Sequence, residues 1–85
     1  MEMGAAGRDV RVGVIGLGGR GFGQMQLLAS MPDVKITAVC DLYEDRVKRS
    51  GDYLAEAFSA RPFETTDYRE VLKREDVETV IIMTS

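Results

Sequence analysis

The sequence predicts an α/β fold in which helices cover both faces of a doubly wound parallel sheet, and three observations support this prediction. Segments typical of strands and of helices alternate along the chain, as they do in βαβ units. The strand segments are rich in apolar residues, as parallel strands buried on both faces are. A glycine-rich turn joins the first strand to the first helix. Because βαβ crossovers are right-handed, we expect the strand order 3-2-1-4.

The first half of the chain predicts two strands with a helix between them. Residues 10–15 form a β-branched run bounded by glycine, which is typical of a buried parallel strand. Apolar residues then recur at helical spacing, and we expect this helix to end near Met31 because Pro32 follows. Residues 34–40 predict the second strand, which ends at Asp41.

A second helix is expected over residues 44–60. Val47, Leu54 and Phe58 fall on one of its faces, which we expect to face the sheet. Gly51 weakens the helix but lies on the same face, where the absence of a side chain permits close packing.

The last third of the chain predicts two short strands and a short helix. A poorly marked third strand is expected within residues 61–65. Asp67 with Glu70 resembles a capping box that opens a third helix, which extends through Lys73. The apolar run at residues 77–83 predicts the fourth strand.

The length of 85 residues allows at most one small domain. We expect residues 1–9 to be a flexible tail and residues 10–85 to form the domain. The chain ends on an apolar strand with nothing after it to cover its far edge, and complete domains avoid such an edge. We therefore expect an N-terminal piece of a longer protein, truncated before its fifth strand.

Composition excludes several classes of function. The net charge of −3 disfavours a nucleic-acid surface, which needs clustered Lys and Arg. Cys40 is the single cysteine and the chain has no histidine, so it holds no disulfide, no zinc site of the usual kind and no Ser-His-Asp arrangement. No apolar stretch approaches the roughly 18 residues of a membrane span. We expect no metal, no membrane partner, and a cytoplasmic location.

One motif carries chemistry, a complete G-x-G-x-x-G loop that reads Gly16-Leu17-Gly18-Gly19-Arg20-Gly21. It follows a strand directly, opens a helix and lies within a βαβ unit, which is the setting of a dinucleotide-binding turn. We expect Gly16 to permit the tight turn, Gly18 to let the main chain approach a pyrophosphate, and Gly21 to let the helix pack closely on the strand. The open N–H groups at the helix start favour phosphate. The alternative is a turn that only connects strand to helix.

Asp41 decides which dinucleotide is expected. It lies 20 residues after Gly21 at the end of the second strand, where a carboxylate accepts hydrogen bonds from the ribose hydroxyls of NAD and repels the 2′-phosphate of NADP. NADP enzymes usually have a small residue here followed by arginine, whereas this chain has Leu42 and Tyr43, with Arg46 a turn further on. NAD is therefore expected over NADP. The alternative role for Asp41 is a helix cap before residue 44.

Four more residues need an interpretation. Three of them could either contact the ligand or have only a structural role, and the fourth is expected to have a structural role alone. Arg20 is expected to contact the pyrophosphate, or else to face solvent at the helix start. Thr84 and Ser85 follow the fourth strand, beside the crevice where open α/β sheets bind ligands, or else belong to an ordinary loop. Cys40 is expected to be a small core residue.

Four segments together resemble the Gfo/Idh/MocA oxidoreductases, the family typified by glucose-fructose oxidoreductase and inositol 2-dehydrogenase. They are the glycine loop with its strand (residues 12–21), residues 39–41, the segment Thr66-Asp67-Tyr68-Arg69-Glu70-Val71-Leu72, and residues 76–82. The resemblance covers residues 10–85. The segment 66–72 is more specific to the family than the glycine loop is.

The resemblance implies an N-terminal Rossmann domain followed by a larger α/β domain that binds substrate and forms oligomers. It implies oxidation or reduction of a sugar, inositol or related polyol. Gly16 to Gly21 and Asp41 carry over as cofactor contacts, and Thr84-Ser85 falls on the nicotinamide side. The family's catalytic lysine, in a Glu-Lys-Pro motif after the fifth strand, and its later histidine lie beyond Ser85. We therefore assign no catalytic residue within the chain.

Three functions follow as hypotheses. The first is an NAD-dependent dehydrogenase whose base, beyond residue 85, takes the hydroxyl proton. The second is an NAD-using glycosidase of the same superfamily, and the third is a dinucleotide-sensing regulator without chemistry. A methyltransferase is disfavoured because its loop generally lacks the third glycine, here Gly21.

Overall fold

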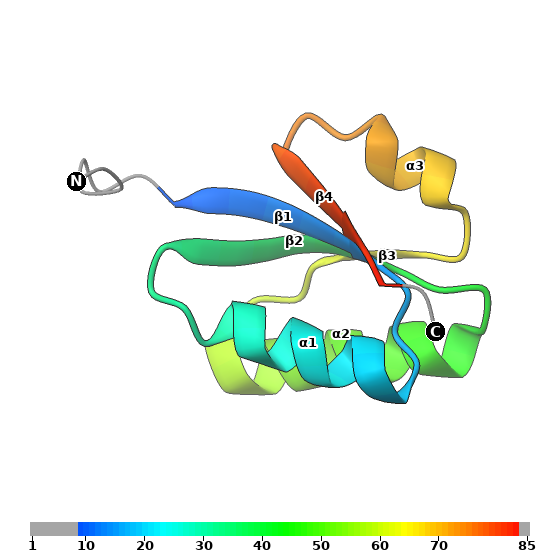
Figure 1. Ribbon diagram of the computed structural model, residues 1–85, viewed down its shortest axis with the longest axis horizontal. Helices are drawn as coiled ribbons and strands as arrows, with labels where there is room; N and C mark the ends of the chain where they lie inside the picture. The colour runs from blue at the N-terminus through cyan, green and yellow to red at the C-terminus, as the bar shows by residue number, and fades with distance from the viewer. Residues whose placement is uncertain (1–8, 84–85) are drawn as a thin grey trace.

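The computed structural model describes residues 9–83, so all but the last residue of the expected tail lies outside the described residues. In the described part, a parallel sheet has the strand order β3-β2-β1-β4, which confirms the predicted order. Helices α1 and α2 cover one face of the sheet and α3 lies on the other (Figure 1). The elements are β1 (Val10–Ile15), α1 (Gly19–Ala29), β2 (Val34–Cys40), α2 (Glu44–Phe58), β3 (Phe63–Thr65), α3 (Tyr68–Leu72) and β4 (Thr79–Ile82).

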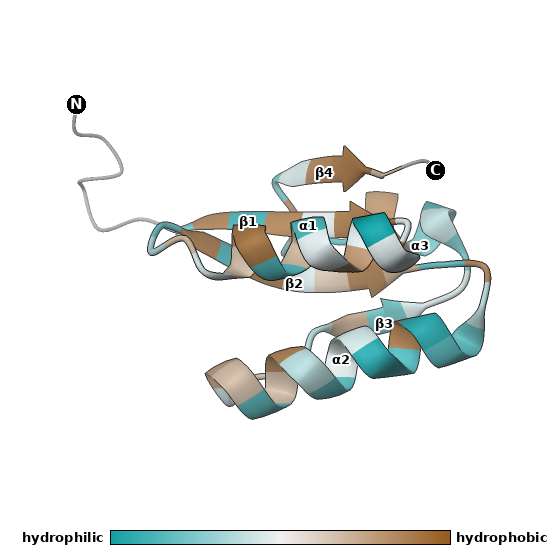
Figure 2. Cartoon of the chain, turned by 60° about the horizontal axis from the view of Figure 1, so that its bottom comes forward, coloured by the Kyte–Doolittle hydropathy of each residue, from teal (hydrophilic) through white to brown (hydrophobic). Residues whose placement is uncertain are grey.

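The core lies on both faces of the central strands. Val14 of β1 pairs with Val39 of β2 on one side and with Ile81 of β4 on the other. Both valines are fully buried, and they join a cluster under α1 and α2 that includes Met25 and Leu54. A second cluster on the opposite face joins β2 to α3. Figure 2 shows apolar residues along the central strands and polar residues over much of α2.

The first two strands have their predicted bounds, whereas the helices and the fourth strand are shorter than predicted. Helix α1 ends at Ala29 rather than near Met31, and α2 ends at Phe58 rather than at residue 60. The physical reason in α2 is Ser59, whose φ of 59° is left-handed and closes the helix. β3 lies within the predicted range of residues 61–65, whereas α3 ends at Leu72 rather than at Lys73 and β4 is Thr79–Ile82 rather than residues 77–83.

The start of α3 differs in detail from the predicted capping box. Asp67 caps the helix as expected, because its Oδ1 accepts a hydrogen bond from the Arg69 N–H at 3.0 Å. In a capping box the Asp67 N–H would donate directly to the Glu70 carboxylate, and here a relay through Thr65 replaces that bond. The Thr65 hydroxyl accepts from the Asp67 N–H at 3.0 Å and donates to the Glu70 carboxylate.

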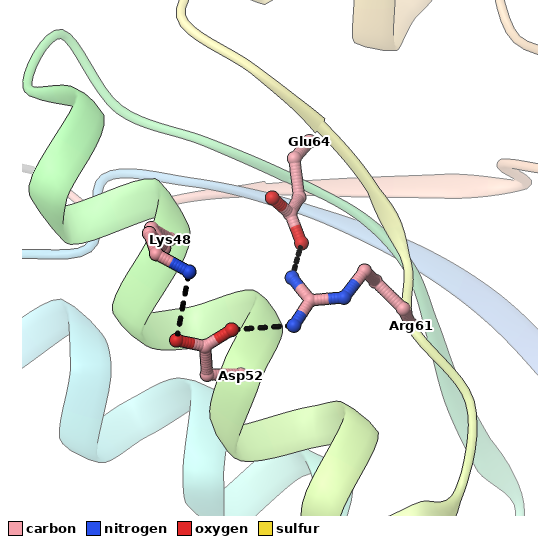
Figure 3. Close-up of polar contacts among 4 residues, drawn as sticks. All are labelled: Lys48, Asp52, Arg61 and Glu64. Carbon is pink, nitrogen blue, oxygen red and sulfur yellow. Dashed lines mark hydrogen bonds and ion pairs between the residues drawn. The ribbon is translucent and has the colours of Figure 1, made fainter.

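Gly51 permits α2 to lie close to β3, as its position on the helix predicts. It is buried, and a Cβ there would overlap the Glu64 carboxylate. Close to Gly51, Arg61 bridges Asp52 of α2 and Glu64 of β3, while Lys48 approaches Asp52 at 3.4 Å (Figure 3). The hydrogen bond from Arg61 lowers the pKa of the Asp52 carboxyl. These exposed ion pairs tie a three-residue edge strand to the helix.

Candidate cofactor-binding site

A cavity of about 550 Å³ opens at the carboxyl ends of β1 and β2. Ligands of open α/β sheets bind in this crevice. The glycine loop, the end of β2, the first turn of α2 and the segment that enters α3 contribute to its walls. The lining residues are Ile15, Gly16, Gly18, Gly19, Arg20, Gly21, Cys40, Asp41, Leu42, Tyr43, Arg46, Thr66, Tyr68 and Met83.

Gly16 and Gly21 are required by the fold itself. Gly16 has φ +101°, and a Cβ there would overlap the carbonyl oxygen of Met83. Its N–H donates to the Cys40 carbonyl at 2.8 Å, so the turn remains hydrogen-bonded to β2 as it leaves β1. A Cβ on Gly21 would overlap the Gly16 carbonyl oxygen. The structure thus shows the tight turn and the close approach of helix to strand that the motif predicts.

Gly18 and Gly19 are not required by the packing of the fold. A Cβ on Gly18 would meet only the Arg46 guanidinium, at 3.2 Å from Nη1, and a Cβ on Gly19 would meet nothing within 4 Å. Both glycines line the cavity. A ligand that needs close access to the main chain accounts for them better than a turn that only connects two elements.

The start of α1 adds a favourable environment for an anion. Gly18 is the N-cap residue in an extended conformation, and no side chain caps the helix. The first turn also contains no acidic residue. The first N–H groups of a helix lack internal partners and carry partial positive charge. The described residues therefore fit a phosphate-bearing group at this end of the cavity.

Asp41 holds the glycine loop in place as well as lining the cavity. Its carboxylate accepts hydrogen bonds from the Leu17 N–H at 2.7 Å and the Tyr43 N–H at 2.9 Å. The residue is only 8% exposed. Tyr43, not Asp41, is the N-cap residue of α2, so the expected alternative of a simple helix cap does not describe it. A carboxylate has about four acceptor positions, so capacity remains for ribose hydroxyls.

The other predicted site residues have different environments. Arg20 is exposed at the cavity wall, and its guanidinium makes no hydrogen bond or ion pair with any residue that the structure describes. Leu17 has its side chain buried in the core, away from the cavity wall. Its carbonyl accepts a hydrogen bond from Arg49 at 2.9 Å, so its role in the structure is to position the loop. Thr84 and Ser85 lie outside the described residues.

Sequence reasoning did not name four side chains of the cavity wall as site residues, although it weighed Leu42 and Tyr43 in the choice between NAD and NADP. Thr66 and Tyr68 come from the segment after β3, and Leu42 and Tyr43 from the segment after β2. Tyr68 is 55% exposed and Leu42 is 84% exposed, so both present apolar surface to a ligand. The carboxyl ends of parallel strands share one edge of the sheet. The position of these residues directly after a predicted strand therefore indicated that they would lie at the cavity.

Cys40 is the buried core residue that the sequence predicts, at 2% exposure. Burial, followed by the nearby charges of Asp41, Asp67 and Glu70, raises the pKa of its thiol. Little thiolate is therefore present at neutral pH, and the thiolate is the reactive form. We expect brief iodoacetamide treatment to leave Cys40 unmodified in buffer and to modify it in urea, as peptide mass spectrometry measures. Equal labelling in both conditions would contradict this burial.

Among the residues described, no helix is long and apolar enough to cross a membrane, and no group of three or more acidic, cysteine or histidine side chains is placed to hold a metal ion.

Comparisons with known proteins agree with this geometry. Residues 10–85 match the family described as the oxidoreductase family, NAD-binding Rossmann fold. A glycosyl hydrolase family 109 protein of Streptomyces coelicolor is 42% identical over 84 residues, which cover 94% of this chain and 18% of that protein. The α-N-acetylgalactosaminidase of Shewanella oneidensis is 35% identical over 79 residues, covering 88% and 17%. The chain thus spans less than a fifth of the length of these relatives.

Solved structures resemble the domain as well. A 3-ketoreductase from Actinomadura kijaniata in complex with NADP has a TM-score of 0.66 and 32% identity, covering 86% of this chain and 22% of that one. GenD2 from gentamicin A biosynthesis, in complex with NAD, has a TM-score of 0.67 and 32% identity, covering 91% and 20%. A myo-inositol dehydrogenase from Lactobacillus casei has a TM-score of 0.75 at 22% identity, covering 89% and 22%, a likeness of fold alone.

Proposed function

The chain belongs to the Gfo/Idh/MocA oxidoreductase family with its NAD-binding Rossmann fold, and from this premise we propose that it holds NAD for an enzyme acting on a sugar, inositol or related polyol. One observation carries the proposal. The cavity at the carboxyl end of the sheet combines two glycines that the fold does not require, an uncapped helix start and a carboxylate. This set suits a pyrophosphate and a ribose.

Each group has a defined role in the proposal. Main-chain N–H groups at Gly18 and Gly19 approach the pyrophosphate, with Arg20 adding charge from the cavity wall. Asp41 accepts the hydroxyls of the adenosine ribose, which favours NAD over NADP. When bound, NAD supplies a hydride acceptor at its nicotinamide ring. Thr84 and Ser85 are proposed to lie on the nicotinamide side.

The rest of the activity is proposed to lie outside the chain. Because the chain spans less than a fifth of the length of its relatives, residues 10–85 are proposed to form the first part of the Rossmann domain, and the base that takes the substrate's proton is proposed to belong to a later segment. A second domain is proposed to bind the polyol and to form a homo-oligomer. The proposed location is the cytoplasm.

A second candidate function is an NAD-using glycosidase, which oxidises and re-reduces its sugar during hydrolysis. The specific observation in its favour is the identity of 42% and 35% to proteins named as glycosyl hydrolase family 109 and α-N-acetylgalactosaminidase. Both functions require this domain to hold the same cofactor. They differ in whether reduced cofactor accumulates.

The test is NADH binding by the longer protein, followed by two assays of activity. We expect wild-type protein to bind NADH, and Gly18→Ala to weaken that binding about tenfold or more, because the methyl group lies where the main chain meets the pyrophosphate. The matched control is Gly23→Ala, in the helix that Gly18 caps. A Cβ on Gly23 would meet no protein atom within 4 Å, and a Cβ on Gly18 would meet only the Arg46 guanidinium. The proposal would be refuted if the wild-type protein bound neither NADH nor NADPH.

The two activities are then separated by their products. A dehydrogenase accumulates NADH when supplied with NAD and a polyol such as inositol. A glycosidase releases the leaving group of an aryl α-N-acetylgalactosaminide without net NADH formation. Binding without either activity across a broad panel of sugars would favour the regulator instead.

A further inference from the structure

Arg49 supports the glycine loop from outside the cofactor cavity. It lies in the second turn of α2 and does not line the cavity. Its Nη2 donates to the Leu17 carbonyl oxygen at 2.9 Å, and its Cζ lies 4.0 Å from the centroid of the Phe22 ring. Leu17 comes directly before Gly18, and Phe22 lies in the first turn of α1, where its N–H donates to the Gly18 carbonyl oxygen at 2.6 Å. The guanidinium therefore contacts both sides of the helix start that is proposed to meet the pyrophosphate.

Leu17 is fixed at three points, and Arg49 provides one of them. The Leu17 N–H donates to Asp41 Oδ2 at 2.7 Å, its carbonyl accepts from Arg49, and its side chain is fully buried. The peptide group that joins Leu17 to Gly18 is trans, so its C=O and N–H point in opposite directions. The hydrogen bond from Arg49 therefore also sets the direction of the Gly18 N–H, which is one of the donors proposed for the pyrophosphate.

Within the described part of the chain, no acidic side chain forms an ion pair with Arg49. The neighbouring cations of α2 differ in this respect. Arg46 Nη1 lies 3.8 Å from Asp41 Oδ1, and Lys48 Nζ lies 3.4 Å from a carboxylate oxygen of Asp52. A guanidinium that donates to a neutral carbonyl keeps its full positive charge, and it polarises the peptide group so that the N–H becomes a stronger donor. Because Arg49 is exposed, solvent screens this charge, and we expect its effect to be modest.

Resting on the proposed function, we propose that Arg49 is a positioning residue that strengthens the binding of a dinucleotide's pyrophosphate without contacting it. It orients the peptide group between Leu17 and Gly18, and it places positive charge behind the glycine loop. This contribution falls on the phosphates, because attraction between charges weakens with distance. The adenosine ribose is proposed to bind Asp41 directly, so it gains little from Arg49. NADH and NADPH carry the same pyrophosphate and gain equally.

The test measures the binding of NADH and NADPH to the longer protein by fluorescence titration, with ADP and adenosine as competitors. We expect Arg49→Gln to weaken NADH, NADPH and ADP about fivefold or more, and to weaken adenosine, which has no phosphate, less than about twofold. Arg49→Lys keeps the charge and loses the planar pair of donors, so its ADP affinity should lie between those of Arg49→Gln and the wild type. If Arg49→Gln does not fold, Phe22→Leu replaces it. This variant removes the ring beside the guanidinium and should also weaken ADP more than adenosine.

The matched control is Lys48→Gln, which removes the same charge from the same helix at a side chain that pairs with Asp52. It should leave all four affinities unchanged. This inference alone is overturned if Arg49→Gln binds NADH and ADP as tightly as the wild type does, or if Lys48→Gln weakens ADP equally. It is also overturned if adenosine weakens as much as ADP, because the substitution would then only displace the loop. Absence of binding of both dinucleotides to the wild type would instead overturn the proposed function.

Discussion

Gly16→Ala should destabilise the domain by about 3 kcal/mol or more, or prevent its folding. Gly16 has φ +101°, a conformation that L-residues rarely adopt. The added methyl group would also overlap the Met83 carbonyl oxygen. Neither strand end can move aside cheaply, because the Met83 N–H is bonded to the Ile15 carbonyl at 2.7 Å. The cost therefore combines backbone strain with the loss of strand pairing at the centre of the sheet.

Denaturant unfolding of the longer protein measures this effect, with Gly23→Ala as the matched substitution. Gly23 lies within α1, where a Cβ would meet no atom within 4 Å. Alanine is a better helix former than glycine, so Gly23→Ala should be neutral or stabilising by up to about 1 kcal/mol. If Gly16→Ala unfolds at the same denaturant concentration as the wild type, the turn does not have the geometry described above.

The parts of the fold that follow from local pattern were predicted from the sequence. β1 and β2 have the bounds that the apolar runs indicate, because central strands that are covered on both faces are rich in apolar residues. The end of α2 was not predictable, because Ser59 adopts a left-handed conformation that serine does not signal. The relay from Asp67 through Thr65 to Glu70 was also missed. Thr65 lies only two residues before Asp67, but the capping-box pattern does not indicate that its hydroxyl replaces the Glu70 carboxylate as the acceptor for the Asp67 N–H.

The candidate site likewise has features that the sequence predicts and features that it does not. The spacing of the glycine loop predicted the turn at Gly16 and the close packing at Gly21. The positive φ of Gly16 and the contact of Gly21 with the Gly16 carbonyl are local, whereas the approach of Gly16 to the Met83 carbonyl is not. The hydrogen bond from the Leu17 N–H to Asp41 spans 24 residues, and no local pattern indicates it. Arg46 was noted only as lying a turn beyond Asp41. Its approach to that carboxylate depends on where α2 begins and on the ring of Tyr43 beneath it.

Asp41→Ala should weaken NADH binding by about 10- to 100-fold, which corresponds to hydrogen bonds with a charged acceptor worth about 1.5–3 kcal/mol. NADPH should lose less affinity or gain some, because the repulsion of its 2′-phosphate disappears and Arg46 is released from its partner at 3.8 Å. The preference for NADH over NADPH should therefore narrow. Titration of both dinucleotides against the longer protein measures the ratio, and an unchanged ratio would refute the role of Asp41 in discrimination.

The same substitution also removes the acceptor of the buried Leu17 N–H, which we expect to cost about 1–3 kcal/mol of stability. A control is needed that loosens the loop without touching the carboxylate, and Arg49→Gln provides it. Arg49 supports the Leu17 carbonyl at 2.9 Å from the side of the Phe22 ring. Its loss should lower stability while leaving the NADH to NADPH ratio unchanged. If Arg49→Gln narrows the ratio as much as Asp41→Ala does, the preference comes from the position of the loop and not from the charge of Asp41.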